Sequence, residues 1–333
     1  MAKTYWQIAA GSSGQARSYS DAFIKYGIAF VGGDNIRTMK EVRTGDIVAI
    51  KAGLSQIIAA GEVVERNGKA TGFQDKSWLE DFDGWDLSAY CYVDWHVPEK
   101  PISTDGLTRV TIQKIHQAKH RDIIDKILLL PVHPHSPEPK ETTLIKDEHL
   151  LEHLLAKGLR PSSADELTNT IRRIRLLAKF YYKQCKWEDI REHETRTFLV
   201  VPLLLALGWS EQQIKIELPC TKGKVDIACF SGVYNGNHKE CILIVETKDF
   251  SSGLDYAPHQ ANSYAEAFPN CKGFLVTNVY CYKVFMRKED GTFNAMPSAY
   301  LNLLKPRDRY PLDPENIDGA LTAFTWLLPK GNA

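Results

Sequence analysis

Four prolines within nine residues divide this chain into two parts of different character. The segment Pro131-Val-His-Pro-His-Ser-Pro-Glu-Pro139 cannot continue a helix or a central strand, because proline lacks a backbone donor and restricts the residue before it. A semi-stiff extended linker is the most economical interpretation. The 333 residues hold enough apolar material for two cores. We therefore expect an α+β protein of two domains, 1–130 and 189–333, separated by a linker and connecting helices over 131–188.

The part before the prolines is rich in strand and turn signals. Short runs of β-branched and aromatic residues alternate with glycines, a pattern that favours a compact β-barrel with short connections. The expected strands are Tyr5–Ala9, Ile28–Val31, Asp46–Lys51, Ile57–Glu65, Ala89–Val97 and Val110–Ile112.

The part after the prolines mixes helices with strands. Gly208 is suited to end the third of four expected helices, because glycine readily adopts a positive φ. Cys241 to Val245 is uninterrupted apolar sequence, which is typical of a central strand covered on both faces. The expected helices are Asp147–Lys157, Ser163–Lys186, Asp189–Leu207 and Tyr256–Phe268, and the expected strands are Ile214–Leu218, Lys224–Phe230, Cys241–Thr247, Lys272–Thr277 and Tyr282–Arg287. A mixed α/β core follows from this order.

Composition excludes several classes of protein. There is no apolar stretch of about 18 residues and no basic-then-apolar leader, so we expect a cytoplasmic protein without a membrane partner. Seven cysteines without a Cys-x-x-Cys pair indicate reduced, mostly buried thiols. The 41 basic and 41 acidic residues balance, which withholds the usual charge signature of a nucleic-acid binder.

A local basic stripe nevertheless occurs between Ile171 and Lys186, where six basic residues stand without one acid. Arg172, Arg173 and Lys179 are the members that we assign to a DNA backbone, since such a stripe neutralises phosphates. A solvated helix face that packs its apolar residues on a neighbour explains the stripe equally well.

Chemistry-bearing residues stand at the ends of two apolar runs in the second part. Asp226 interrupts the first run, and Glu246-x-Lys248 ends the second. The two carboxylates are hard oxygen ligands of the kind that Mg²⁺ prefers, and Lys248 projects from the same strand face as Glu246. A carboxylate pair with an ammonium can hold a metal, polarise a phosphodiester and orient water. An unpaired carboxylate in such a run is costly, so a surface ion pair is the weaker interpretation.

Six elements in order resemble a known nuclease family. They are Glu192-x-x-Thr195-Arg196, Val-Pro-Leu-Leu-Leu-Ala-Leu-Gly-Trp209, Val-Asp226-Ile-Ala, Ile-Val-Glu246-Thr-Lys248, Gln260-x-x-x-Tyr264 and Leu-Val-Thr-Asn278. Together they resemble the N-terminal nuclease domain of type I restriction enzyme R subunits, within the PD-(D/E)XK superfamily. The resemblance covers about residues 189–287.

The resemblance implies a role for each matched side chain. Asp226 and Glu246 would hold Mg²⁺, with Mn²⁺ as a substitute, and Lys248 would orient water or stabilise developing charge. Glu192 would complete the acidic cluster. Gln260 and Tyr264 would support the site or touch the DNA backbone. An R subunit also has a helicase motor, but this chain has no Gly-x-x-x-x-Gly-Lys-Ser/Thr loop, so no ATP requirement is expected.

The first part resembles another family. Its Gly45-Asp-Ile-Val-Ala-Ile50 and Ile57-Ile-Ala-Ala-Gly-Glu-Val-Val64 segments are similar to PUA-like barrels of the EVE type, which recognise modified bases. Such barrels accept a flipped base between aromatic walls and polar edge readers. The residues that we assign to this pocket are Trp6, Ser12, Ser13, Trp78, Asp94 and Trp95, although most aromatics in any barrel are core.

The two resemblances together predict a type II/IV-like restriction endonuclease for antiphage defence. A PUA-like reader would dock 5-methylcytosine or 5-hydroxymethylcytosine in double-stranded DNA, and the nuclease would hydrolyse nearby phosphodiester bonds. Duplex cleavage needs two active sites, so we expect a homodimer. Two alternatives stay open: a degenerate nuclease fold that only binds modified DNA or RNA, and a ribonuclease.

Overall fold

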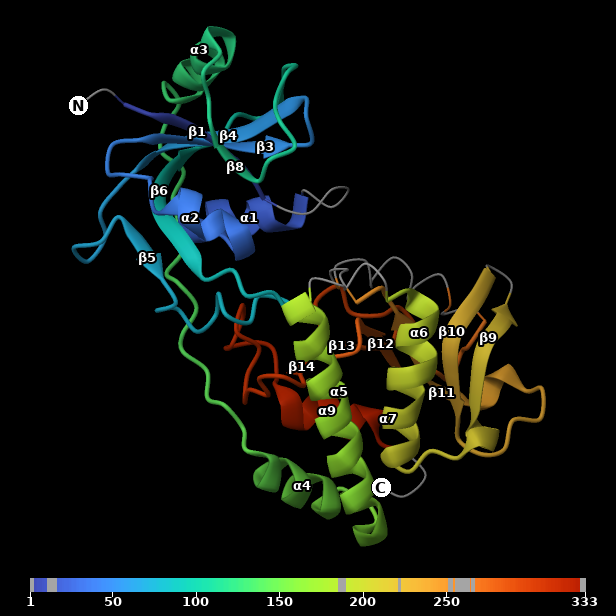
Figure 1. The fold of residues 1–333 in the computed structure, drawn as a ribbon. Helices are drawn as coiled ribbons and strands as arrows, with labels where there is room; N and C mark the ends of the chain where they lie inside the picture. The colour runs from blue at the N-terminus through green and yellow to red at the C-terminus, as the bar shows by residue number, and fades with distance from the viewer. Residues whose placement is uncertain are drawn as a thin grey trace. The chain divides into compact units, whose positions relative to one another are not determined.

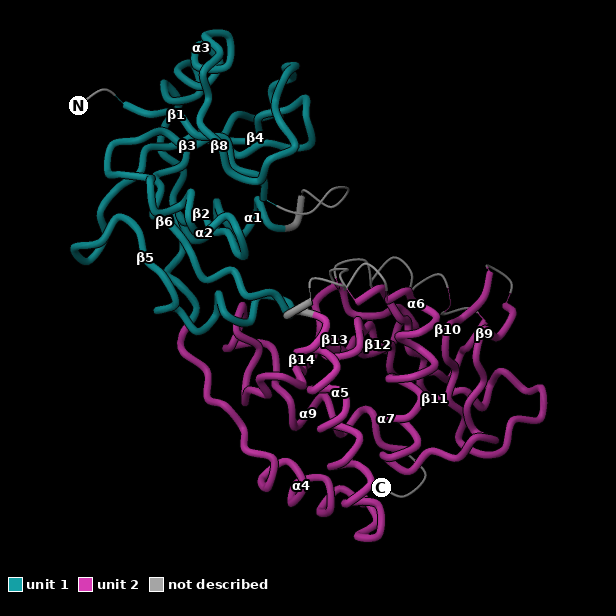
Figure 2. The backbone as a smooth tube through the Cα atoms, viewed as in Figure 1, with its two compact units in different colours: residues 1–139 teal, residues 140–333 magenta. Residues whose placement is uncertain are grey.

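The computed structural model describes residues 3–10, 17–184, 190–220, 223–250, 254, 264 and 267–329. The chain divides into two compact units, Met1–Pro139 and Lys140–Ala333 (Figure 2). The first unit contains a curled, half-barrel mixed sheet, and the second contains another mixed sheet with helices packed on it (Figure 1). The α+β class predicted from the sequence is confirmed at this level.

Strands dominate the first unit. Their order in the sheet is β2-β6-β4-β3-β1-β8, with β5 paired to β6 and β7 paired to β4. The elements are β1 (Tyr5–Ala9), α1 (Arg17–Tyr26), β2 (Ile28–Val31), η1 (Gly33–Asn35), α2 (Ile36–Met39), β3 (Ile47–Ala52), β4 (Gln56–Val63), β5 (Thr71–Phe73), β6 (Ala89–His96), β7 (Ile102–Ser103), β8 (Ile112–Lys114) and α3 (Ala118–Ile127).

One face of this sheet is covered by α3. Ile47 and Ala49 of β3 pack against Ile124 and Ile127, all buried. Close strand packing explains the glycine of β4, because a Cβ on Gly61 would lie 2.4 Å from a backbone oxygen of β6. The six strands expected here are present, but α1 and α3 were not predicted. Their short apolar faces lie among strand-like runs, and periodicity is weak over ten residues.

The proline-rich segment is tied to the first unit. The backbone N–H of His133 donates to the carbonyl of Trp95 at 2.6 Å, and that of Ser136 donates to the carbonyl of Lys25 at 2.6 Å. The Glu138 carboxylate accepts a hydrogen bond from the indole of Trp78 at 3.3 Å and pairs with Lys76. The segment is therefore extended, as expected, and docked through backbone hydrogen bonds on β6 and α1.

The second unit alternates helices with a six-stranded sheet. The strand order is β14-β13-β12-β11-β10-β9, in which only β11 and β12 run parallel to one another among the described strands. The elements are α4 (Asp147–Ala156), η2 (Pro161–Ser163), α5 (Ala164–Gln184), α6 (Glu192–Thr195), the π-helical η4 (Arg196–Val200), α7 (Val201–Ala206), η5 (Glu211–Gln213), β9 (Ile214–Cys220), β10 (Gly223–Phe230), η6 (His238–Glu240), β11 (Cys241–Thr247), β12 (Gly273–Thr277), β13 (Cys281–Met286), β14 (Ala299–Asn302) and α9 (Ala320–Leu327).

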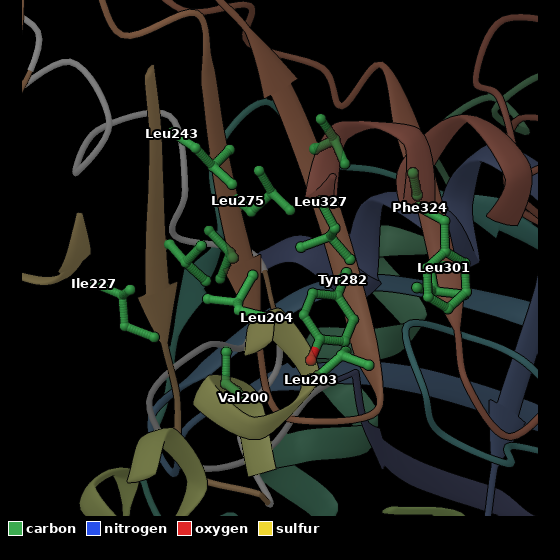
Figure 3. Packing of buried hydrophobic residues seen from close by; sticks show 14 of the residues in the cluster. Val200, Leu203, Leu204, Ile227, Leu243, Leu275, Tyr282, Leu301, Phe324 and Leu327 are labelled. Carbon is green, nitrogen blue, oxygen red and sulfur yellow. The ribbon is translucent and has the colours of Figure 1, made fainter. Parts of the chain in front are cut away.

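The helix from α6 to α7 packs its apolar stripe onto this sheet. Val200, Leu203 and Leu204 recur at the three- and four-residue spacing of one helix face, and they point toward Leu275 and Tyr282 of the sheet (Figure 3). All five side chains are fully buried. This packing holds the start of the helix over the edge of the sheet where β10 begins and β11 ends.

Gly208 ends this helix, as the sequence predicts. Its φ is +103°, a conformation that favours glycine. The N–H of Trp209 donates to the carbonyl of Leu204, and the N–H of Gly208 donates to the carbonyl of Leu205. This pair of bonds is a Schellman motif, which satisfies carbonyls that the helix end would leave open.

The two connecting helices belong to the second unit. Leu154 of α4 and Leu167 and Ile174 of α5 are fully buried in the same apolar cluster as the sheet. Asp147 of α4 and Arg175 of α5 form a bidentate ion pair with oxygen–nitrogen distances of 2.5 and 2.8 Å. Helix α4 contacts α9, and α5 contacts α7 (Figure 1). The unit boundary therefore follows the prolines directly.

The remaining predictions for the second unit concern its later strands and one helix, and those for the whole chain concern the cysteines and membrane spans. The strands predicted after Gly208 are present, while β14 and α9 were not predicted. Most of the helix expected at Tyr256–Phe268 lies outside the described residues. The described cysteines are free thiols, and all but the half-buried Cys220 are buried. None of the helices in the described part of the chain is long and apolar enough to cross a membrane.

Candidate active site

Three acidic side chains lie at one level of three neighbouring strands in the second sheet. Ile227 of β10 pairs with Val245 of β11, so Asp226 and Glu246 follow one residue beyond that pair. On the other side of β10, the register with β9 sets Glu217 opposite Asp226. Residues paired across neighbouring strands share a face. The sheet thus brings together the two carboxylates singled out in the sequence and adds a third.

Donors hold both oxygens of Asp226. Its Oδ1 accepts a hydrogen bond from Nη1 of Arg196 at 2.6 Å. Its Oδ2 accepts two, from the backbone N–H and from Oγ1 of Thr247, each at 2.8 Å. The Asp226 side chain is only 13% exposed, so these contacts are largely shielded from water.

Arg196 reaches Asp226 from the π-helical turn η4, an irregularity that is frequent at functional sites. The Arg196 side chain is 4% exposed, and its Nη2 donates to Oε1 of Glu217 at 2.8 Å. The same nitrogen lies 2.8 Å from Nδ1 of His193. Glu217 has a φ of +51°, which is uncommon for a residue with a side chain. A backbone strained in this way therefore stands directly beside Asp226.

Glu246 and Lys248 form the second pair of the site. Nζ of Lys248 lies 2.8 Å from Oε1 of Glu246, and both side chains are mostly buried. The backbone N–H of Lys248 donates to the carbonyl of Thr277, so the chain keeps its strand direction past the end of β11. The contact agrees with the expectation that the two side chains project from one face.

Glu192 lies within electrostatic reach of this cluster. Burial, together with the negative charges of Asp226 and Glu246, raises the pKa of Glu192 to about 7, although the Lys248 ammonium acts in the opposite direction. A carboxyl whose pKa is raised by neighbouring carboxylates lies in a region with surplus negative charge. A bound cation would relieve that surplus.

The carboxylate oxygens of Asp226 and Glu246 fit Mg²⁺ as a site with two protein ligands. Within the part of the chain that the structure describes, no group of three or more His, Cys, Asp or Glu side chains is close enough to hold a metal ion by itself. Mg²⁺ does not require such a cage, since it keeps several waters and is often bound through one or two carboxylates plus phosphate oxygens. Asp226 and Glu246 are the pair that suits this coordination.

The remaining predicted residues of the second unit have different surroundings. Gln260 lies outside the described residues. The Tyr264 hydroxyl donates to the carbonyl of Lys224 at 3.1 Å, and its ring is 6% exposed. Burial, with the charges of Glu246 and Asp226, raises the pKa of the Tyr264 hydroxyl. Of its two expected roles, support of the site is the one that this contact provides, and burial withdraws Tyr264 from the DNA backbone.

The predicted DNA-backbone residues of α5 are exposed. Arg172, Arg173 and Lys179 lie on its outer face, together with the exposed apolar side chains of Leu176 and Phe180. Both earlier interpretations, phosphate contact and solvated helix face, are compatible with this mixed surface.

The tryptophans predicted to line a base pocket are packed in the core of the first unit. The indole N–H of Trp6 donates to Oδ2 of Asp46 at 3.0 Å, and that of Trp95 donates to the carbonyl of Phe23 at 2.9 Å. Both rings are 1% exposed, and Trp78 is 3% exposed. Buried indoles with an internal partner are structural. These three rings are therefore not the walls of an open pocket, which corrects their assignment.

Three polar residues, Asp94, Ser12 and Ser13, were also predicted to line the base pocket. Asp94 forms an ion pair with Arg66 at 2.9 Å and remains 39% exposed at its side chain. Ser12 and Ser13 lie outside the described residues.

Three residues of the site received no role from the sequence. Thr247 and Arg196 stand inside the quoted motifs, and the four-residue spacing of Arg196 from Glu192 was a usable signal. No sequence pattern indicated Glu217 as a residue of the site, because only the register of β9 against β10 places it beside Asp226.

Comparison with known proteins adds no relative. No protein-family model matches the chain, and a search of curated proteins finds no match. The function must therefore be inferred from the geometry of the site.

Proposed function

We propose that this chain is a Mg²⁺-dependent endodeoxyribonuclease that hydrolyses phosphodiester bonds in double-stranded DNA bearing modified cytosine. The observation that carries the proposal is the meeting of Asp226, Glu246 and Lys248 at one edge of a mixed sheet. Two hard carboxylate ligands beside an ammonium suit phosphodiester hydrolysis, and the nearby Glu192 adds negative charge for a cation to balance.

Each side chain has a role in this proposal. Asp226 and Glu246 would hold Mg²⁺, and the ion would supply Lewis acidity at the scissile phosphate. Lys248, kept beside Glu246 at 2.8 Å, would orient the attacking water and face the charge that develops on the phosphate. Both side chains of the pair are mostly buried, which limits bulk water and strengthens these electrostatic contacts.

The reader of modified cytosine is assigned to the first unit. Its half-barrel sheet and the glycine that β6 requires at position 61 agree with the PUA-like pattern in the sequence. The assignment no longer relies on Trp6, Trp78 and Trp95, which are core residues. A homodimer, or two copies paired on DNA, would supply the two sites needed to cut both strands.

Cleavage assays test the proposal directly. The full chain is incubated with Mg²⁺ and with duplexes that differ only in carrying cytosine, 5-methylcytosine or 5-hydroxymethylcytosine. We expect cleavage of a modified duplex, and a loss of 10²-fold or more in Asp226→Ala and Glu246→Ala, because electrostatic stabilisation is usually a dominant catalytic contribution.

Glu289→Ala is the matched control. This exposed acid follows β13 at the opposite edge of the same sheet, so its loss should leave cleavage unchanged. Equal cleavage of all three duplexes would contradict the proposed recognition of modified cytosine. Full activity of Asp226→Ala would contradict the assignment of the active site.

A second function is favoured by one specific observation. Asp226 already pairs with Arg196, and Glu246 already pairs with Lys248, so both acids are balanced by cations of the protein itself. A chain that only binds modified DNA or RNA would have this arrangement without needing a metal. Calorimetric titration with Mn²⁺ separates the two functions, since binding that is lost in Glu246→Ala supports the nuclease.

The ribonuclease alternative is tested in the cleavage assay described above, with a modified RNA duplex as the substrate.

A further inference from the structure

The hydrogen bonds of Asp226 leave it little freedom. A carboxylate offers about four lone-pair sites on its two oxygens. Thr247 fills two sites on Oδ2 through its backbone N–H and its hydroxyl, and Arg196 fills one on Oδ1. By this inventory a single site on Oδ1 stays available. A cation bound there would meet Asp226 as a monodentate ligand in one orientation.

The guanidinium that fixes Oδ1 is itself held from the other side. Glu217 accepts from Nη2 of Arg196 while Nη1 donates to Asp226, so the planar fork spans two carboxylates on neighbouring strands. Such a fork orients what it binds far better than the point charge of a lysine does. Two opposing carboxylates would otherwise repel one another across β9 and β10, and the guanidinium relieves that repulsion.

We propose that Arg196 is a positioning residue of the metal site, which holds Asp226 for monodentate ligation and is anchored by Glu217. The inference rests on the proposed nuclease function and adds a residue to it. Arg196 stays in place when the metal binds, because its side chain is 4% exposed and its withdrawal would leave the mostly buried Asp226 facing the part-exposed Glu217 without a cation between them. Hydrogen-bond partners of this kind orient metal ligands and raise affinity for the ion.

Calorimetric Mn²⁺ titration of the full-length protein tests the inference without relying on cleavage. Wild type, Arg196→Met, Arg196→Lys and Glu217→Gln are compared, with Asp226→Asn marking the loss of the site. We expect Arg196→Met to bind Mn²⁺ about 10- to 100-fold more weakly, as for other partners of metal ligands. Arg196→Lys should recover part of that loss, and Glu217→Gln should weaken binding less than Arg196→Met does.

Arg191→Met is the matched control, since Arg191 precedes the same helix with an exposed side chain, and it should bind Mn²⁺ as wild type does. Circular dichroism verifies that each variant is folded at the titration temperature. If Arg196→Met does not fold, Glu217→Gln and Arg196→Lys decide the matter, because both keep a cationic side chain with an aliphatic stem at position 196.

The outcomes are distinguishable. Wild type that binds Mn²⁺, with loss in Asp226→Asn and unchanged or tighter binding in the folded Arg196 and Glu217 variants, overturns the positioning role and leaves the nuclease proposal standing. Wild type that binds no Mn²⁺ overturns both. Weaker binding in the folded Arg196 and Glu217 variants, together with loss of binding in Asp226→Asn and unchanged binding in Arg191→Met, supports the inference.

Discussion

At the scale of the residue, the candidate site depends on how one carboxylate is oriented. Asp226 lies near the start of β10, one residue before its first pair with β11, where the N–H of Thr247 would lack a strand partner. The Asp226 carboxylate takes over that N–H and also accepts from the Thr247 hydroxyl. A side chain thus completes the strand pairing at the point where the proposed metal would bind.

Removing only the Thr247 hydroxyl tests this orientation. Thr247→Val keeps the shape and the backbone N–H but loses one donor to a charged acceptor, so we expect unfolding to require about 1.5 to 3 kcal/mol less. We also expect Mn²⁺ affinity to fall about tenfold. Urea denaturation and calorimetry measure the two effects. Thr247→Ser, which keeps the hydroxyl, is the control, and equal Mn²⁺ affinity of the Val and Ser variants would contradict the prediction.

At the scale of the element, the helix from α6 to α7 carries Glu192 and Arg196 to the sheet edge, and its apolar stripe determines where it lies. Sequence spacing alone predicted this helix, its end at Gly208 and the strands on which it packs. The ten-residue helix α1, which lies between β1 and β2, escaped prediction because tertiary packing rather than local pattern stabilises it.

Truncating the stripe should loosen the site together with the core. Leu204→Ala leaves a cavity against the sheet, because Leu204 is fully buried, and we expect a loss of about 2 to 5 kcal/mol in unfolding free energy. Leu176→Ala on α5 is the control, since that side chain is 59% exposed and should change stability by less than about 0.5 kcal/mol. Chemical denaturation of both variants gives the comparison, and similar losses would argue against the packing.

The ion pair between α4 and α5 should make stability depend on pH. Hydrogen bonds from Arg175 hold the pKa of Asp147 below its ordinary value. A lowered carboxyl pKa stabilises the fold above the unfolded pKa of about 3.9, and the contribution disappears as pH falls through the lower folded pKa.

Asp147→Asn should therefore cost about 0.5 to 1 kcal/mol at pH 7, a value limited by the half-exposed side chain. The difference from wild type should shrink below about pH 4. Urea denaturation at several pH values measures it. Glu148→Gln, an exposed acid in the same first turn, is the control, and a difference that persists unchanged at low pH would refute the role of the ion pair.

At the scale of the whole molecule, the two units have separate cores. The apolar cluster of the second unit runs from Leu150 to Leu328, and a cluster of the first unit lies between Ile47 and Ile127. Units with their own cores are able to fold alone.

We expect fragments 1–139 and 140–333 to fold separately, with cooperative thermal unfolding of each. The second fragment should keep Mn²⁺ binding, because Glu192, Asp226 and Glu246 all belong to it. Selectivity for a modified duplex should be lost from that fragment and remain as binding in the first. A second fragment that still discriminates modified from unmodified DNA would place the reader elsewhere.

By itself, the sequence determined the features that depend on neighbouring residues. The proline-rich divide, the strands from β9 to β13 and the helix end at Gly208 follow from local periodicity and from the conformational limits of proline and glycine. The same logic selected Asp226, Glu246 and Lys248, because charged residues at the ends of apolar runs are costly without a partner.

Only the tertiary structure decided which side chains meet and which are buried. Strand register, a contact between distant segments, sets Glu217 opposite Asp226 and brings Arg196 between them. Packing density turned Trp6 and Trp95 from expected pocket walls into core residues with satisfied N–H groups. Composition and spacing do not encode these outcomes, since burial and register depend on the free energy of the whole packed unit.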